Sequence, residues 1–111
     1  MESNLYSKFK EIDIRVGKII EVQEFPEAKN PSYKLNIDLG DELRIMKSSA
    51  QITNYKIEDL TGLSCIAVIN LGKKQIGPYI SECLILGSIN KEGKVLLLEP
   101  SSDAKLGDRI Y

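Results

Sequence analysis

Histidine is absent from this 111-residue sequence, and cysteine occurs only twice, as Cys65 and Cys83. Without histidine the chain has no His-based catalytic triad, no HExxH zinc motif and no mixed Cys/His metal site. It also has neither a P-loop nor a GxGxxG motif. Catalysis by carboxylates or lysine stays open on chemical grounds, but no pattern in the sequence points to it. We therefore expect a protein that is not an enzyme and that binds no metal or cofactor.

Long apolar runs are missing as well. No stretch approaches the roughly 18–20 residues of a membrane span, and residues 1–10 lack the apolar core of a signal peptide. These features predict a cytoplasmic protein without membrane insertion. Because Cys65 and Cys83 lie in apolar, strand-like runs, we interpret them as reduced thiols of the core.

The charges nearly cancel, with 15 Lys and Arg against 16 Asp and Glu and a formal net charge of −1. Bulk charge therefore does not drive this chain to nucleic acid. The charges are unevenly distributed, however, since residues 60–81 and residues 43–57 contain no acid. Binding to phosphates depends on the charges close to them, so a local basic face is still compatible with the net charge.

The hydrophobic pattern predicts a single domain over residues 1–111 that is built mainly of strands. Strands are expected near residues 12–22, 33–39, 43–47, 63–71, 83–87 and 95–98, and residues 104–111 are interpreted as a turn followed by a short terminal strand. Gly17 lies inside the first run, where it suggests a bulge or sharp coil. Short helices are expected up to about Lys10 and within residues 48–60, the second ended by Gly62. Five or six strands with a helix between the third and fourth predict an all-β, five- to six-stranded OB-fold barrel.

OB-fold barrels bind ligands on the face of strands 2 and 3 and with the flanking loops. In this sequence those places carry Lys34, Arg44, Lys47 and the segment 70–82. The segment joins two apolar runs and contains two adjacent lysines, two glycines and a proline. A cationic, turn-rich loop of this kind is suited to hold a polyanion, so the fold and the charge pattern predict one surface.

Four motifs in order resemble a known family. They are DIRVGKI at residues 13–19, YKL at 33–35, KSSAQI at 47–52, and segment 70–82 with its KQIGP core. Together they resemble the CsaA-type tRNA-binding domain, which is related to modules of methionyl-tRNA synthetases and of the beta chain of bacterial phenylalanyl-tRNA synthetases. The resemblance covers roughly residues 9–110. It implies an OB fold, homodimerisation and tRNA binding and, for the CsaA branch, an export-related chaperone that binds unfolded preproteins.

One departure from the CsaA pattern lies in segment 70–82. CsaA-type loops often carry Phe-Pro-Pro after the asparagine, whereas this chain has Leu71, Gly72 and Lys73 there. The result is a more flexible and more cationic loop. This departure puts peptide contacts by loop prolines in question and favours nucleic acid as the ligand.

The residues that we predict to bind RNA combine basic, hydroxyl and amide side chains with one carboxylate. They are Lys34, Arg44, Lys47, Ser48, Ser49, Gln51, Asn70, Lys73, Lys74, Gln75, Ser81 and Glu82. The alternatives are structural: lysines at a solvated loop tip, a serine at 48 or 49 that caps the following helix, and polar loop residues bonded to the backbone. Tyr33 and Tyr79 are candidates either for stacking on an unpaired base or for covering the barrel rim.

Other residues carry predictions of a different kind. The candidates for contact with a peptide, which the chaperone alternative requires, are Ile76, Pro78, Tyr79 and Ile80. Apolar residues on the terminal elements either plug the barrel or form a dimer interface: Leu5, Phe9, Leu106, Ile110 and Tyr111. The family resemblance favours the homodimer. Asp13, Arg15 and Lys18 belong to a family motif, but we interpret them as ion-pairing residues of the first strand.

Overall fold

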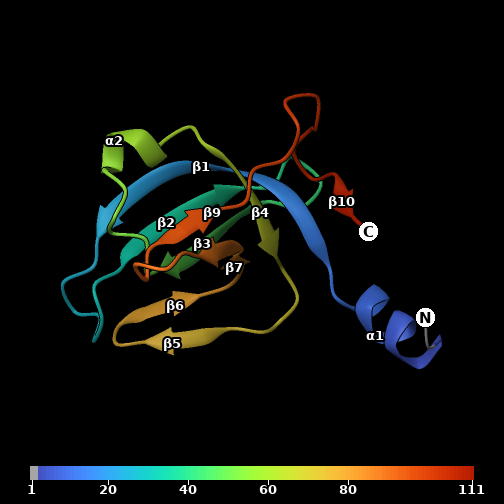
Figure 1. The fold of residues 1–111 in the computed structure, drawn as a ribbon, viewed down its shortest axis with the longest axis horizontal. Coiled ribbons are helices and arrows are strands. Elements are labelled where there is room, and N and C mark those ends of the chain that lie inside the picture. The colour runs from blue at the N-terminus through green and yellow to red at the C-terminus, as the bar shows by residue number, and fades with distance from the viewer. Residues whose placement is uncertain (1–2) are drawn as a thin grey trace.

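The computed structural model describes residues 3–111, and its centre is an antiparallel sheet (Figure 1). The strand order is β3-β2-β1-β4-β7, and β10 also pairs with β1. The strands of this sheet are β1 (Ile14–Glu24), β2 (Tyr33–Asp38), β3 (Ile45–Ala50), β4 (Ser64–Val68), β7 (Leu84–Ile85) and β10 (Arg109–Ile110). Because β3 also lies beside β7, the sheet nearly closes on itself. The predicted all-β OB-fold barrel is confirmed.

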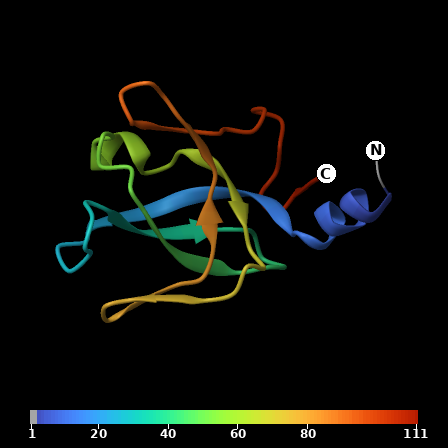
Figure 2. The same cartoon turned by 60° about the horizontal axis from the view of Figure 1, so that its bottom comes forward.

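Two helices accompany the barrel within residues 3–111. The helix α1 (Ser3–Glu11) comes before β1, and the short α2 (Ile57–Leu60) lies between β3 and β4, as the sequence predicts. Figures 1 and 2 both show α1 projecting from the end of the barrel at which the C-terminus lies. Among residues 3–111, no helix has the combination of length and apolar character needed to span a membrane.

Two hairpins extend the barrel. The first pairs β5 (Lys74–Ile76) with β6 (Tyr79–Ser81), and the second pairs β8 (Gly87–Ile89) with β9 (Val95–Leu97). Segment 70–82 is therefore largely a β-hairpin rather than the loop that its composition suggests. Its turn places Gly77 at a φ of 57°, a left-handed conformation that glycine adopts readily. The hairpin holds the lysines of the segment in a fixed place beside the barrel.

The predicted bulge at Gly17 is wrong. The pairing of β1 with β4 runs through Gly17 without a shift, whereas the pairing of β1 with β2 shifts between Ile19 and Glu21. Gly17 is needed for close packing, because a Cβ there would lie 2.7 Å from Ile37 Cγ2. The true bulge leaves Ile19 fully buried and Ile20 38% exposed, although Ile20 shares the period-two alternation of the apolar residues Ile14, Val16 and Val22. It also turns Glu21 to the outer face.

The core lies inside the barrel and is almost entirely aliphatic. Its main cluster contains Ile19, Leu35, Ile37, Leu39, Ile52, Leu60, Cys65, Ala67, Cys83 and Ile85. Cys65 and Cys83 are buried free thiols, as predicted. A second cluster of Ile14, Val16, Ile66 and Val68 packs with Ile110 of β10. The alternation of Leu35 and Ile37 into the core leaves the intervening side chains of β2 on the outer face.

Candidate nucleic-acid interface

Strand register places six polar side chains on the outer face of the sheet. Glu21 on β1 pairs with Asn36 on β2, which in turn pairs with Lys47 on β3. The next row across the same strands is Gln23, Lys34 and Ser49. Directly paired residues project to the same face, so these rows form a single polar surface. A hollow of about 170 Å³, the sheet hollow, lies over it and is lined by Glu21, Gln23, Lys34, Asn36, Lys47 and Tyr79.

Tyr79 forms one wall of the sheet hollow. Its hydroxyl donates to the carbonyl oxygens of Leu35 and Ser48, each at 3.2 Å, and burial raises the pKa of this hydroxyl. The ammonium groups of Lys34 and Lys47 lie 5.6 and 5.4 Å from the centre of its ring. The ring is thus fixed to two strands, and two positive charges converge beside it. Stacking of a base on Tyr79 stays a prediction and would require the lysine side chains to move.

A larger groove of about 830 Å³, the hairpin groove, lies between the β5–β6 hairpin, the β1–β2 connection, the end of β3 and strands β7–β9. Seven of the predicted site residues line it: Ser49, Gln51, Lys73, Lys74, Gln75, Ile76 and Ser81. Sequence reasoning missed Lys29 and Asn30, which line it from the β1–β2 connection. The rule that OB folds bind with the loops flanking strands 2 and 3 could have identified them.

The charge of the hairpin groove is of one sign. Lys29, Lys73 and Lys74 line it, and no Asp or Glu of the described chain does. The groove lining also includes the exposed apolar residues Leu71, Leu84 and Ile89. A groove lined by both lysines and aliphatic groups can hold a polyanion, and it also offers apolar contacts. No group of three or more His, Cys, Asp or Glu that could hold a metal occurs among residues 3–111.

The structure corrects the interpretation of the serines on β3. Ser48 is 0% exposed, and its hydroxyl donates to the carbonyl oxygen of Cys83 at 2.8 Å. Its hydroxyl is therefore used inside the protein and does not face the groove. The predicted serine cap of the following helix is also wrong, because Lys56 occupies the N-cap of α2. Ser49 does lie at the groove, where its N–H donates to the Ser81 hydroxyl at 3.2 Å.

Glu82 and Arg44 join the base of the β5–β6 hairpin to the sheet. The Glu82 carboxylate accepts hydrogen bonds from the Lys47 N–H at 2.9 Å and from Arg44 at 3.2 and 3.4 Å. The hydrogen bond from Lys47 is the main reason that the pKa of Glu82 lies below its ordinary value, and Arg44 lowers it further. These two predicted RNA contacts therefore neutralise each other in part and have a structural task.

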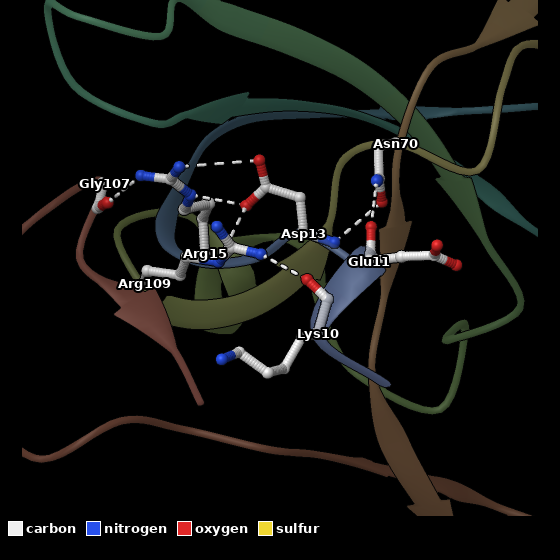
Figure 3. Close-up of polar contacts among 7 residues, drawn as sticks. All are labelled: Lys10, Glu11, Asp13, Arg15, Asn70, Gly107 and Arg109. Carbon is white, nitrogen blue, oxygen red and sulfur yellow. Dashed lines mark hydrogen bonds and ion pairs between the residues drawn. The ribbon is translucent and has the colours of Figure 1, made fainter. Parts of the chain in front are cut away.

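Asn70 is also engaged within the protein (Figure 3). Its Oδ1 accepts the N–H of Asp13 at 2.8 Å, and its Nδ2 donates to the carbonyl oxygen of Glu11 at 2.7 Å. These bonds fasten the end of β4 to the junction of α1 and β1. Asn70 lines neither the hairpin groove nor the sheet hollow.

The interpretation of Asp13 and Arg15 as ion-pairing residues agrees with the structure. Arg15 Nε lies 2.6 Å from the Asp13 carboxylate, and Arg109 Nε lies 3.8 Å from it. Arg109 also donates to the carbonyl oxygen of Lys10, so β10 is tied to α1 as well (Figure 3). Lys18 lies opposite Asp38 in the β1–β2 pairing.

Comparison with known proteins identifies the family. The family model described as "Putative tRNA binding domain" matches residues 14–109. The chain belongs to this family. The solved structure of the CsaA chaperone protein from Picrophilus torridus is 50% identical, with a TM-score of 0.91 over 96% of this chain and 97% of that chain. The chaperone CsaA from Bacillus anthracis is 39% identical, with a TM-score of 0.88 over 96% of each chain. The resemblance to CsaA-type tRNA-binding domains is thus confirmed.

Curated relatives of this tRNA-binding domain are much longer proteins. The methionine–tRNA ligase of Methanocaldococcus jannaschii is 37% identical over 110 residues, which are 99% of this chain and 17% of the ligase. That of Thermococcus kodakarensis is also 37% identical, and the matched region is 14% of its length. The chain therefore spans a small part of the curated relatives that it matches.

Of the remaining predicted site residues of this tRNA-binding domain, some cover the rim of the barrel and others are exposed to solvent. Tyr33 is half-buried and its hydroxyl donates to the carbonyl oxygen of Tyr55 at 2.9 Å, which agrees with a rim residue that covers the barrel. Gln75 donates to the carbonyl oxygen of Gly77 at 3.2 Å. On the apolar half of the hairpin, Pro78 and Ile80 are exposed. Contact of these residues with a peptide stays a prediction.

Four of the five apolar residues predicted on the terminal elements are exposed and do not plug the barrel. Leu5 is 61% exposed and Phe9 is 42% exposed, on a helix that projects away from the core. Tyr111 is 85% exposed, Leu106 is exposed, and Ile110 packs partly against the second core cluster. This tRNA-binding domain thus carries exposed apolar side chains on α1 and at its C-terminal end.

Proposed function

We propose that this chain is a non-catalytic tRNA-binding protein that holds RNA in the hairpin groove and the sheet hollow. The observation that carries the proposal is the local charge. On a chain of net charge −1, the groove is lined by Lys29, Lys73 and Lys74 without an acid, and Lys34 and Lys47 extend the basic surface over the sheet. This surface lies within the region that matches the tRNA-binding family.

The mode of recognition follows from the composition of the surface. Five lysines supply point charges for phosphates, while Ser49 and Gln51 supply hydrogen-bonding groups for sugars or bases. With few aromatics, the surface is not an extended stacking platform. Binding should therefore depend on phosphates, shape and 2′-hydroxyl groups, and it should weaken steeply with salt.

Homodimerisation is part of the proposal. The uncovered side chains of Leu5, Phe9 and Tyr111 lie at one end of the molecule, where burial against a second copy would remove them from water. Two modest basic surfaces that contact one RNA gain by avidity. A dimer would explain how a weakly acidic chain binds tRNA with useful affinity. A cytoplasmic location belongs to the same proposal.

Filter binding against total tRNA tests the proposed function directly. We expect saturable binding to tRNA, and native mass measurement of the complex should give two protein chains per RNA. A single-stranded DNA of the same length serves as the matched competitor, because it has the same phosphates without the 2′-hydroxyls. Displacement of tRNA by this DNA at equal concentration would contradict specific tRNA binding.

A second candidate function is an export-related chaperone that binds unfolded preproteins. The apolar part of the hairpin groove lining favours it, since Leu71, Leu84 and Ile89 are exposed there, and so does similarity to two proteins described as CsaA chaperones. The discriminating experiment is competition between tRNA and an unfolded preprotein. Mutual displacement would indicate one shared surface, and the absence of any complex with the preprotein would contradict the chaperone function.

A further inference from the structure

A carboxylate and two amides line the sheet hollow next to its lysines. Glu21 and Gln23 lie on β1 and Asn36 lies on β2, and none of them is among the residues predicted from the sequence to bind RNA. Asn36 Nδ2 donates to Glu21 Oε1 at 2.6 Å, and Gln23 Nε2 donates to Glu21 Oε2 at 3.0 Å. Each carboxylate oxygen accepts one hydrogen bond here and keeps a second lone pair. Glu21 is thus a positioned pair of acceptors that can take two more donors.

The bulge of β1 creates this arrangement. Side chains alternate along a regular strand, so Glu21 would share the inward side of Ile19 if the pairing with β2 had no shift. Because the shift falls between Ile19 and Glu21, the carboxylate faces outward and opposite Asn36. Bulges often serve to re-aim a side chain next to a binding site.

The size of the sheet hollow limits its ligand. At about 170 Å³ it is smaller than the roughly 300–1,000 Å³ pockets that bury drug-sized molecules. It is suited to one flat ring system rather than to a base pair or a folded peptide. The fixed ring of Tyr79 forms an aromatic wall, and the hollow opens on the same surface as the lysines proposed to hold phosphates.

We propose that the sheet hollow binds one unpaired guanine, with Glu21 accepting the N1–H and N2–H donors of its Watson–Crick edge. This inference rests on the proposed RNA-binding function and names the nucleotide that one part of the site prefers. Among the four common bases, guanine alone presents two adjacent donors on this edge. Adenine and cytosine place an acceptor beside their amino group, and uracil has one N–H between two carbonyl oxygens. Those acceptors would face the carboxylate without a partner.

The lysines of the hollow complete the set of contacts. Guanine carries the acceptors O6 and N7 on the side away from its N2 amino group, and a lysine ammonium is a common partner for both. Lys34 and Lys47 lie in the same two rows of side chains as Glu21 and Gln23. The site therefore has acceptors for the donor side of guanine and donors for its acceptor side.

Inosine provides the sharpest test, because it differs from guanosine only in lacking the N2 amino group. Two fluorescent, uridine-rich RNAs of about 12 nucleotides, within the site size of an OB fold, would carry one central guanosine or one inosine. We expect the guanosine RNA to bind about tenfold more tightly, as the loss of half a bidentate contact suggests. Glu21→Gln replaces one acceptor by an amino donor and should abolish this preference.

Glu24→Gln is the matched control. Glu24 lies on the same strand and carries the same charge, but it lines neither the hairpin groove nor the sheet hollow. Both substitutions remove one negative charge, so both should raise the general affinity for RNA to a similar extent. Only Glu21→Gln should change the ratio of the two affinities.

The outcomes separate the inference from the proposed function. Equal binding of the two RNAs, or a preference that survives Glu21→Gln, would overturn the guanine site while tRNA binding stands. Failure to bind any RNA, total tRNA included, would overturn both. A second readout uses the unmodified protein: the side-chain amide NMR signals of Gln23 and Asn36 should shift with guanosine monophosphate and clearly less with inosine monophosphate. Equal shifts with both nucleotides would also count against the inference.

Discussion

Glu82 and Lys47 are joined by two hydrogen bonds that run in opposite directions. The Glu82 N–H donates to the Lys47 carbonyl oxygen at 2.7 Å, and the Glu82 carboxylate accepts the Lys47 N–H at 2.9 Å. The first bond continues the sheet from β3 to the chain after β6, and the second adds a charged acceptor at the same point. This pair fixes the base of the β5–β6 hairpin and with it the place of the groove lysines.

The pair predicts a pH-dependent contribution of Glu82 to stability. The folded-state pKa of Glu82 lies below its ordinary value of 4.5, mainly because of the Lys47 N–H. Ionised Glu82 therefore stabilises the fold above that value, and this stabilisation is lost as the pH falls through the lower folded-state pKa. We expect Glu82→Gln to lower the free energy of unfolding by about 1 kcal/mol at neutral pH and to have a smaller effect in acid. Urea unfolding at both pH values measures the difference.

Glu92→Gln is the control for Glu82, since Glu92 is an exposed residue of the β8–β9 turn. It should leave the stability unchanged at both pH values. An effect of Glu82→Gln that is constant with pH would show that its charge does not contribute.

The groove lysines are predicted to contact phosphates. Reversing two charges by Lys73→Glu and Lys74→Glu should weaken tRNA binding by about tenfold or more at moderate salt. A plot of log affinity against log salt has a negative slope, and its magnitude should decrease by about 1.5 because two phosphate contacts are lost. Filter binding over a series of salt concentrations measures both quantities.

A matched pair of lysines lies on the other hairpin. Lys91 and Lys94 are exposed in the β8–β9 turn and line neither the hairpin groove nor the sheet hollow. Their replacement by glutamate changes the net charge equally but should leave the salt slope nearly unchanged. If both double variants lost the same tRNA affinity, binding would depend on the net charge of the protein and not on the lysines of the groove.

Asn70 separates a structural task from an RNA contact. Asn70→Ala removes the bonds to Asp13 and Glu11, which leaves a backbone N–H and a carbonyl oxygen without these partners. Because both bonds are solvent-exposed, we expect a loss of only about 0.5–1.5 kcal/mol in the free energy of unfolding, with tRNA affinity unchanged at temperatures where the variant is folded. A variant of normal stability and weak tRNA binding would restore the prediction made from the sequence.

The sequence predicts those parts of the fold that depend on local pattern. Alternation along residues 33–39, followed by a glycine turn, is sufficient to predict the β2–β3 hairpin, and the continuous apolar run of β4 is typical of a buried strand. The bulge of β1 is not local. Whether Ile19 or Ile20 faces inward depends on the pairing with β2, and both residues have the same side chain.

The position of a candidate side chain relative to the groove can be predicted from the sequence where charge is the signal, but not where strand register decides it. Lys73 and Lys74 are conspicuous in an acid-free segment, and the structure brings them to the groove. Ser48 and Ser49 are adjacent and chemically identical, yet the pleat of β3 buries one and leaves the other at the groove. Glu21 meets Asn36 only through pairing across 15 residues of sequence, so no local pattern could have found them.

The two thiols should be inert in the folded protein. Burial raises the pKa of Cys65 to about 12 and that of Cys83 to about 11, so almost no thiolate is present near neutral pH. We expect Ellman's reagent to modify neither cysteine in the native state at pH 8 and to modify both in denaturant. Rapid reaction of the native protein would contradict the buried placement. Because these pKa values are raised, stability should decline as the pH rises from about 9, where thiols of the unfolded chain begin to ionise.

The exposed apolar face of α1 leads to the last prediction, which concerns assembly. Leu5 and Phe9 lie one helical turn apart on the same side of α1. If this side is buried in a homodimer, Leu5→Asp and Phe9→Asp together should give a folded monomer in sedimentation experiments. The loss of the second RNA-binding surface should lower tRNA affinity by about 100-fold, through loss of avidity alone.

Ser7→Asp is the control for the dimer, because Ser7 lies on the opposite side of α1 and is exposed. It adds a negative charge to the same helix without entering the apolar face, so the dimer should persist. A double variant that stays dimeric would place the interface elsewhere. A double variant that is monomeric yet binds tRNA with normal affinity would show that one basic surface suffices, and avidity would then not be needed to explain tRNA binding by a chain of net charge −1.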